Sequence, residues 1–233
     1  QLTGEQRKLY LANQDRIAQQ VQHREASEFK KDKLKVLAEL TKLRQICCDP
    51  RLHYEDYKAG SAKLDTCMEL VHGALDGGHR ILLFSQFTGM LDIIGKRLAK
   101  EDIAFLKLTG ASSKESRAKM VAQFQAGEVP VFLISLKAGG VGLNLTAADV
   151  VIHYDPWWNV AAQDQATDRA HRIGQQHTVT VYKLIAKDTI EERIMQMQES
   201  KRDLVNSVLG GDGISSALFT REDVLALLGG DGR

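Results

Sequence analysis

The chain has 233 residues, of which 43% are hydrophobic and 26% are charged, as in soluble globular proteins. Its 31 basic and 30 acidic side chains give a net charge of +1, so overall charge argues neither for nor against a nucleic-acid partner. No apolar run reaches the roughly 18 residues that a membrane span requires, and the chain start lacks the apolar segment of a signal peptide. We expect a soluble protein without a membrane partner, located in the cytoplasm (on the nucleoid in a bacterium, in the nucleus in a eukaryote).

The three cysteines, Cys47, Cys48 and Cys67, form no C-x-x-C pair, and their number is odd. Such a set indicates buried thiols in a reducing compartment, not a disulfide framework. The seven histidines have no ligand-like spacing near the cysteines. The sequence therefore predicts no metal site.

Residues 1–59 are expected to be mostly helical and polar. Within residues 34–48 apolar side chains recur with helical spacing, and Pro50 ends this helix. The apolar positions are Val36, Leu40, Leu43 and Cys47. The main interpretation is an amphipathic helix that packs on a core. The alternative is a basic arm that contacts phosphates, because lysines cluster just upstream, at Lys30, Lys31, Lys33 and Lys35.

From residue 61 the pattern changes to alternating helices and strands. The expected helices are 61–75, 88–100 and 113–124, and the expected strands lie within 77–87, 103–110, 129–135, 148–155 and 178–186. The strands contain continuous apolar runs, which are typical of strands buried on both faces. Strands separated by helices of this length indicate βαβ units. The predicted fold class is therefore α/β, with a doubly wound, mainly parallel sheet flanked by helices.

Three helix starts are expected from their capping residues. Ser112 and Glu115 have the spacing of a capping box, as do Thr189 and Glu192. Thr220 is the expected cap of a terminal helix. The chain divides accordingly into a helical segment at 1–59, an α/β lobe at 60–187 and a helical extension at 188–233.

Ligands of doubly wound sheets bind at the carboxyl ends of the strands. The candidate binding loops follow Ser85, Leu108, Ser135 and Tyr154. The third of them contains Gly139, Gly140 and Gly142, and such glycines let a phosphate approach the backbone. The alternative is a tight strand-to-helix connection with no ligand. Leu145 replaces the third glycine of a dinucleotide fingerprint, so that motif is excluded.

The sequence has no P-loop. Its only Gly-Lys dipeptide, Gly95-Lys96, is followed by Arg97, and Met90 stands where the motif needs its first glycine. No Asp-Glu pair is present to hold a magnesium ion. The chain therefore lacks the parts that bind and hydrolyse a nucleoside triphosphate by themselves.

Arg169 and Arg172 lie three positions apart, so in a helix their guanidinium groups share one face. Spacing alone favours a surface ion pair with Asp164 or Asp168, which would contribute about 0–1 kcal/mol. The alternative is a pair of arginine fingers directed at a triphosphate bound elsewhere. Such arginines accelerate phosphoryl transfer by roughly 10³–10⁵.

Trp157 and Trp158 follow the fourth expected strand. Adjacent tryptophans are costly to expose because each carries a large apolar surface, so one of them is expected in the core. The other either stacks on a nucleic-acid base or wedges against a helix. The alternative is that both are packing anchors.

Several stretches resemble the C-terminal motor lobe of the Swi/Snf-type ATPases, which belong to the superfamily 2 helicases. They are RILLFSQF (80–87), LKLTG (106–110), LISLKAGGVGLNLTAADVVIHYDPWWN (133–159) and QATDRAHRIGQ (165–175). LRQICCDPRL (43–52) and VYKLIAKDTIEERI (181–194) match as well. The resemblance spans most of the chain and implies a second RecA-like lobe, entered through a helical connecting segment, from a protein that we expect to be bacterial.

The resemblance implies roles for residues at matching positions. The implied nucleotide-site residues are the catalytic Arg169 and Arg172, together with Gly142, Asn144 and Gln165. The implied DNA-contact residues are Ser85, Gln86, Thr109, Gly110, Ser135, Lys137, Gly139 and Trp157. Two departures concern DNA contact: Leu136-Lys137 replaces the Thr-Arg pair of many members, and Val160 replaces a frequent proline.

The implied function is the second motor lobe of an ATP-dependent double-stranded-DNA translocase or remodeller. ATP with Mg²⁺ would bind mainly to an N-terminal RecA-like lobe of the same polypeptide, and a DNA-bound protein complex is a further expected partner. This chain alone is expected to be inactive. The alternative is a non-catalytic DNA- or protein-binding module that retains the lobe fold. A self-contained nucleotide-binding regulator is disfavoured because the P-loop is absent.

Overall fold

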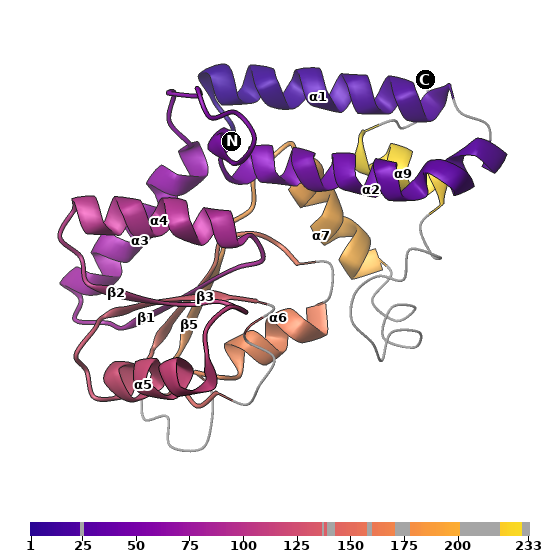
Figure 1. Ribbon diagram of the computed structural model, residues 1–233. Coiled ribbons are helices and arrows are strands. Elements are labelled where there is room, and N and C mark those ends of the chain that lie inside the picture. The colour runs from indigo at the N-terminus through magenta and orange to yellow at the C-terminus, as the bar shows by residue number, and fades with distance from the viewer. Residues whose placement is uncertain are drawn as a thin grey trace. The chain divides into compact units, whose positions relative to one another are not determined.

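The computed structural model in Figure 1 describes residues 1–23, 26–136, 138, 143–157, 160–170, 178–200 and 220–229. The chain forms two compact units. The first contains residues 1–63 and 185–233, and the second contains residues 64–184. The two helical end segments that the sequence separated thus belong to one unit.

The second unit is built on a five-stranded sheet in the order β2-β3-β1-β4-β5. The strands are β1 (Ile81–Ser85), β2 (Phe105–Leu108), β3 (Val131–Ser135), β4 (Val150–His153) and β5 (Thr180–Lys183). Each described pairing between neighbouring strands is parallel. The predicted α/β class with a parallel, doubly wound sheet is confirmed.

Burial across the sheet explains why the apolar runs identified the strands. Every residue of β1, β3 and β4 is buried, because these three strands occupy the middle of the sheet and are covered on both faces. The two edge strands differ from them. β2 is partly buried and β5 is exposed throughout, so the continuous apolar signal is weakest at the edges.

Helices cover both faces of this sheet. They are α3 (Ala62–Asp76, which begins in the first unit), α4 (Thr88–Lys100), α5 (Lys114–Gln125) and α6 (Val160–Thr167). Figure 1 shows α3 and α4 on one face and α5 and α6 on the other. On the latter face Phe124 of α5 and Ala166 of α6 join a buried apolar cluster with Phe84 and Phe132. This cluster holds α6 against the sheet.

The helix start expected at Ser112 is wrong by one residue. α5 begins after Ser113, whose side chain accepts the backbone N–H of Ser116 at 3.1 Å. Ser112 instead accepts the N–H of Thr109 at 3.2 Å. Two adjacent serines can both fill a capping position, and here the first closes the preceding turn and the second caps the helix.

The Gly95-Lys96 dipeptide lies inside α4 and not in a loop. A Cβ atom at Gly95 would come within 2.9 Å of the Phe105 ring. The glycine therefore lets α4 pack closely on β2, and this role is unrelated to phosphate binding.

The first unit is helical. Its described elements are α1 (Gly4–Gln22), α2 (Ala26–Cys48), a 3₁₀ turn (Pro50–Leu52), α7 (Ile190–Ser200) and α9 (Arg221–Leu227). α1 packs along α2 and α9, and Thr220 caps α9 in a capping box with Asp223, which confirms the predicted cap. Among the described helices, none has the length and apolar character of a bilayer span.

The predicted amphipathic helix is the second half of α2. Its apolar side chains are buried, which confirms the packing interpretation. They are Val36, Leu40, Leu43 and Cys47. Cys47, Cys48 and Cys67 are buried thiols, as predicted.

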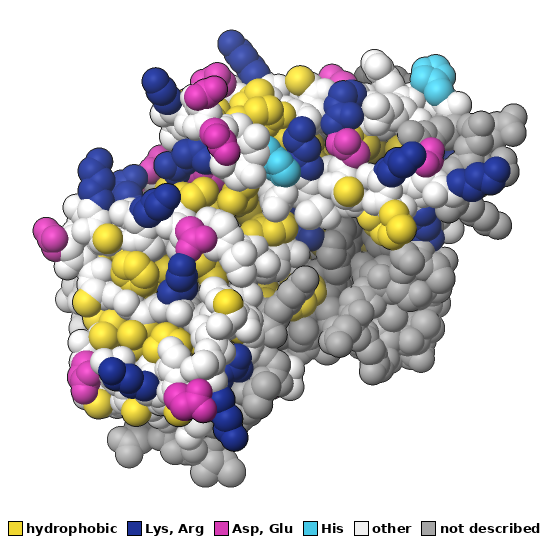
Figure 2. Space-filling view, viewed as in Figure 1, with side chains coloured by type: hydrophobic (Ala, Val, Ile, Leu, Met, Phe, Trp, Pro, Cys, Tyr) yellow, Lys and Arg dark blue, Asp and Glu magenta, His cyan; other side chains and the backbone are white. Residues whose placement is uncertain are grey.

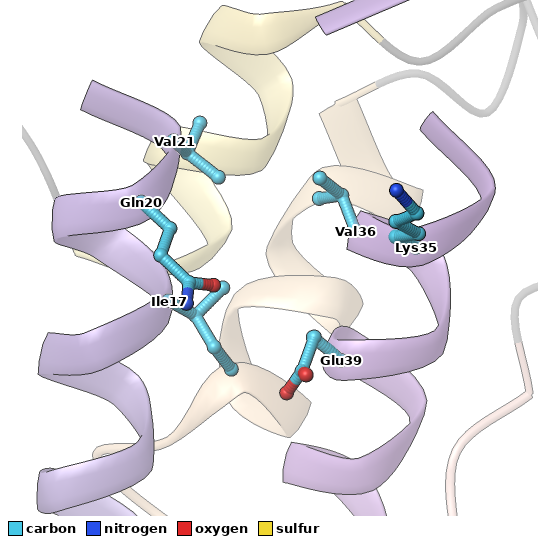
Figure 3. Close-up of a pocket in the computed structure, with 6 residues that line it drawn as sticks. All are labelled: Ile17, Gln20, Val21, Lys35, Val36 and Glu39. Carbon is cyan, nitrogen blue, oxygen red and sulfur yellow. The ribbon is translucent and has the colours of Figure 1, made fainter. Parts of the chain in front are cut away.

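A cavity of about 210 Å³ opens between α1 and α2 (Figure 3). Its lining combines three apolar side chains with three polar ones: Ile17, Val21 and Val36, and Gln20, Lys35 and Glu39. None of these residues belongs to the predicted nucleotide or DNA site. The cavity is therefore a feature of the helical unit and not of the candidate site.

Candidate functional site

The carboxyl ends of the parallel strands bring together several predicted site residues. Ser85 and Ser135 end β1 and β3 and are register partners. Their exposed fractions are 0% and 2%. The N–H of Leu136 donates to the carbonyl of Ser85 at 3.0 Å, so the two loops leave the sheet side by side. Both serine side chains are buried.

A buried carboxylate organises the loop after β1. Asp155 is 1% exposed, and its Oδ1 accepts a hydrogen bond from the Ser85 hydroxyl. Its Oδ2 accepts the backbone N–H of Gln86 at 3.3 Å and the side-chain Nε2 of Gln86 at 2.6 Å. We call Ser85, Gln86 and Asp155 the Asp155 cluster. Motif matching missed Asp155, although an acidic residue just after a buried strand was a usable signal.

Trp157 lies in the loop that follows Asp155. It is half-buried and packs against the apolar cluster formed with α5 and α6. The side-chain Nε2 of Gln86 also donates to the carbonyl of Pro156 at 3.2 Å. The loop that carries Trp157 is thus bound to the loop after β1, and Trp157 fits the packing-anchor interpretation. Trp158 lies outside the described residues.

The loops after β2 and β3 meet at α5. Thr109 is half-buried and Gly110 is exposed, immediately before the turn that enters α5. Arg117 of α5 donates from Nη1 to the carbonyl of Ala138 at 2.9 Å. This bond ties the start of the glycine-rich loop to α5, and sequence reasoning missed it. Lys137, Gly139, Gly140 and Gly142 lie outside the described residues.

The glycine-rich loop and the arginine segment are joined through the backbone. The N–H of Leu145 donates to the carbonyl of Arg169 at 3.1 Å. Asn144 and Gln165 are exposed, whereas Arg169 is 3% exposed. The structure therefore brings the loop of Asn144 next to the arginine segment. Arg172 lies outside the described residues.

His153, at the end of β4, holds the helix that precedes Arg169. Its Nε2 lies 2.9 Å from the Thr167 hydroxyl, and that hydroxyl donates to the carbonyl of Gln163 at 3.3 Å. The imidazole stacks on Phe84, with ring centroids 5.5 Å apart and an interplanar angle of 21°. Its Nδ1 has no hydrogen-bond partner among the described residues. This pattern fits a neutral ring that carries its proton on Nε2.

Burial, followed by the positive charge of Lys183, lowers the pKa of His153 to about 4. The ring is therefore neutral in the folded protein at neutral pH. In the unfolded chain the same ring titrates near 6.5. The unfolded state thus binds a proton between these pKa values that the folded state excludes.

We expect the free energy of unfolding to decrease as the pH is lowered from about 6.5 to about 4. Urea unfolding at pH 7 and pH 5 should show the wild type losing about 2 kcal/mol more than His153→Gln, which has no imidazole to titrate. The comparison between the two proteins cancels groups that titrate in both. Equal losses would contradict a neutral buried imidazole.

Charges on the visible surface are mixed. In Figure 2 the described Lys and Arg side chains are interspersed with Asp and Glu on the face shown. This face therefore offers no single-sign surface to a nucleic acid. The carboxyl edge of the sheet, with its grouped loops, is the candidate.

Residues 62–174 match the family model described as the helicase conserved C-terminal domain. Together with the parallel sheet and the loops at its carboxyl edge, this match defines a RecA-like helicase domain. The SWI2/SNF2 ATPase C-terminal domain of Sulfolobus solfataricus is 32% identical, with a TM-score of 0.78, and the match covers 97% of this chain and 93% of that domain. The chain belongs to the SWI2/SNF2 ATPase family.

Longer relatives agree with this assignment. The S. solfataricus SWI2/SNF2 ATPase core in complex with dsDNA is 35% identical over 97% of this chain and 48% of that one, with a TM-score of 0.79. A Mycoplasma pneumoniae protein described as an uncharacterized ATP-dependent helicase is 41% identical over 94% of this chain and 21% of its own length. The chain spans about a fifth of the length of the first curated relatives it matches.

Proposed function

We propose that the chain is the second motor lobe of an ATP-dependent double-stranded-DNA translocase. Support comes from membership of the SWI2/SNF2 family and from the absence of a P-loop in a chain that contains the arginine motif. In this proposal a first lobe on the same polypeptide binds ATP and Mg²⁺ through its P-loop. The second lobe closes on the nucleotide and supplies the arginines.

The observation that carries the proposal is the hydrogen bond from the N–H of Leu145 to the carbonyl of Arg169, at 3.1 Å. It joins the loop of Asn144 to the arginine segment, so groups of both segments can face one nucleotide. Exposed Asn144 and Gln165 are proposed to contact it, with Gly142 in the same loop. The bond also connects the phosphate-facing segment to a loop that begins at the predicted DNA-contact residues.

Arg169 starts from a buried position in this proposal. Arg169 is 3% exposed, so its guanidinium reaches a triphosphate only after the side chain or the segment shifts on closure. We therefore choose Arg172, the other arginine of the motif, for the first test of the arginine role. A planar guanidinium can bind phosphate oxygens with two parallel hydrogen bonds and stabilise charge that develops in the transition state.

DNA contact is proposed for the loops after β1, β2 and β3. Ser85 and Ser135 are buried, so they would act by shaping their loops. Exposed Gly110, half-buried Thr109 and the charge of Lys137 would meet the phosphate backbone, while Trp157 would link this contact to lobe closure. Backbone contacts of this kind carry little sequence information and depend on salt.

The isolated 233-residue chain provides a direct test of this division of labour. It is expected to bind duplex DNA of any sequence in a fluorescence-anisotropy titration and to hydrolyse no ATP. Raising salt from about 50 mM to about 200 mM should weaken binding by about 10- to 100-fold if about two to four phosphates are contacted. Adding the P-loop lobe should restore DNA-stimulated hydrolysis.

Two outcomes would overturn the proposal. Robust ATP hydrolysis by the isolated chain would mean that it contains a complete nucleotide site. DNA binding that never responds to nucleotide, even with the first lobe present, would favour a non-catalytic binding module with the lobe fold.

A further inference from the structure

Asp155 is a buried carboxylate for which the family motifs matched above assign no role. It is 1% exposed, and a carboxylate in such a place is costly unless donors surround its oxygens. The donors described for it are uncharged: the Ser85 hydroxyl, the Gln86 backbone N–H and the Gln86 side-chain amide. A carboxylate held only by short-range hydrogen bonds of this kind depends on their geometry. A shift of either loop therefore disturbs the other.

The Asp155 cluster joins the loop after β1 to the loop after β4. The Ser85 hydroxyl oxygen also accepts the N–H of Phe87 at 3.1 Å, just before α4 begins at Thr88. Gln86 reaches across to the carbonyl of Pro156 at 3.2 Å. The loop after β1 and the loop that carries Trp157 are thus fastened to each other at both the backbone and the side-chain level.

β4 extends this connection towards the arginine segment. His153, two residues before Asp155, lies 2.9 Å from the Thr167 hydroxyl through its Nε2. Thr167 ends α6, two residues before Arg169. The end of one strand therefore contacts a predicted DNA-contact loop through Asp155 and the arginine-bearing segment through His153.

We propose that Asp155 is a positioning residue that couples DNA contact at the loop after β1 to the catalytic arginines. The proposal rests on the proposed function as a DNA-stimulated motor lobe. When duplex DNA binds the loop after β1, the Asp155 cluster carries the shift to the Trp157 loop and to the end of β4. Coupling of this kind appears in turnover and leaves ATP affinity largely unchanged.

The test uses steady-state ATPase kinetics of the two-lobe polypeptide with saturating duplex DNA. Asp155→Asn keeps the shape but places an amide N–H against the donors of Gln86. We expect DNA-stimulated kcat to fall about tenfold or more while the KM for ATP stays within about twofold. Asp92→Asn, a matched change at an exposed carboxylate paired with Lys107, should leave both values at wild-type levels.

A rescue separates positioning from simple structural damage. Combining Asp155→Asn with Gln86→Glu restores one donor–acceptor pair with its polarity reversed. The double variant still lacks the bond from Gln86 to the carbonyl of Pro156, so it should recover part of the lost kcat. Additive losses in the double variant would overturn the proposal, because interacting residues are expected to be non-additive. If Asp155→Asn does not melt cooperatively, Ser85→Ala, which keeps the carboxylate, should lower kcat several-fold. Wild-type kcat in that variant would overturn the proposal too.

The two proposals fail in distinguishable ways. If wild-type ATPase activity does not respond to DNA, the motor-lobe function itself fails. If the wild type responds and Asp155→Asn responds equally, the motor-lobe function stands and the positioning role of Asp155 is wrong.

Discussion

Replacing Arg172 with alanine in the two-lobe ATPase is expected to lower kcat by about 10³–10⁵, the range known for loss of an arginine finger. The physical reason is that a guanidinium fork stabilises the charge that accumulates on the phosphoryl oxygens in the transition state. Affinity for duplex DNA should change little, because the contact is with the nucleotide. Single-turnover and steady-state ATPase assays measure the first effect, and anisotropy measures the second.

Two further variants make this result specific. Arg172→Lys keeps the charge but loses the planar fork, so it should recover only part of the activity. Arg16→Ala removes one arginine from an exposed ion pair with Glu39 in the helical unit and should leave kcat unchanged. An unchanged kcat in Arg172→Ala would exclude a role in catalysis and favour a surface ion pair with Asp164 or Asp168.

Replacing Lys63 with methionine is expected to lower the free energy of unfolding by about 3–5 kcal/mol, the range for breaking a buried ion pair. Lys63 donates to Glu191 within the helical unit, and their side chains are 4% and 0% exposed. Glu191 also accepts the N–H of Ala186 at 2.8 Å. The substitution leaves this carboxylate buried without its cation, and urea unfolding at neutral pH measures the loss.

Lys63 is expected to be charged under those conditions. Burial lowers the pKa of Lys63, but the carboxylate of Glu191 opposes it and leaves this pKa above its ordinary value. Lys35→Met is the matched control, because Lys35 pairs with Asp32 at 2.9 Å with 77% of its side chain exposed, and exposed pairs contribute about 0–1 kcal/mol. A loss below about 1 kcal/mol for Lys63→Met would mean that the buried carboxylate of Glu191 does not depend on its cation.

Local patterns in the sequence predicted the sheet and most of its helices. Continuous apolar runs identified β1, β3 and β4 because central parallel strands are buried on both faces. The Thr220 cap was equally readable, because its partner Asp223 lies three residues away. The Ser112 cap was missed by one residue because Ser113 competes for the same place.

Contacts between distant segments could not be read in the same way. Asp155 meets Ser85 across 70 residues, and Lys63 meets Glu191 across 128 residues. Tyr10 accepts the N–H of Ile190 at 2.7 Å across 180 residues, and this contact helps to make one unit of the two chain ends. No periodicity or motif spacing reports such pairings, because they depend on the topology of the fold.

In the candidate site, too, local motifs could be predicted from the sequence and contacts between distant segments could not. The resemblance to family motifs predicted that Asn144, Gln165 and Arg169 share one site. In the structure, the loop of Asn144 contacts the carbonyl of Arg169. The motifs said nothing of His153 or Asp155, because a buried polar side chain acts through partners that only the fold brings near. Roles for Arg172, Lys137, Gly139 and Gly142 stay predictions.

The motor-lobe function is tested by the ATPase activity of the polypeptide that joins this lobe to its P-loop lobe, measured with and without duplex DNA. We expect slow hydrolysis in the absence of DNA and a kcat raised about tenfold or more by duplex DNA, equivalent to about 1.4 kcal/mol off the activation barrier. If hydrolysis is absent, or proceeds at the same rate without DNA, the chain is not the second lobe of a DNA-stimulated motor.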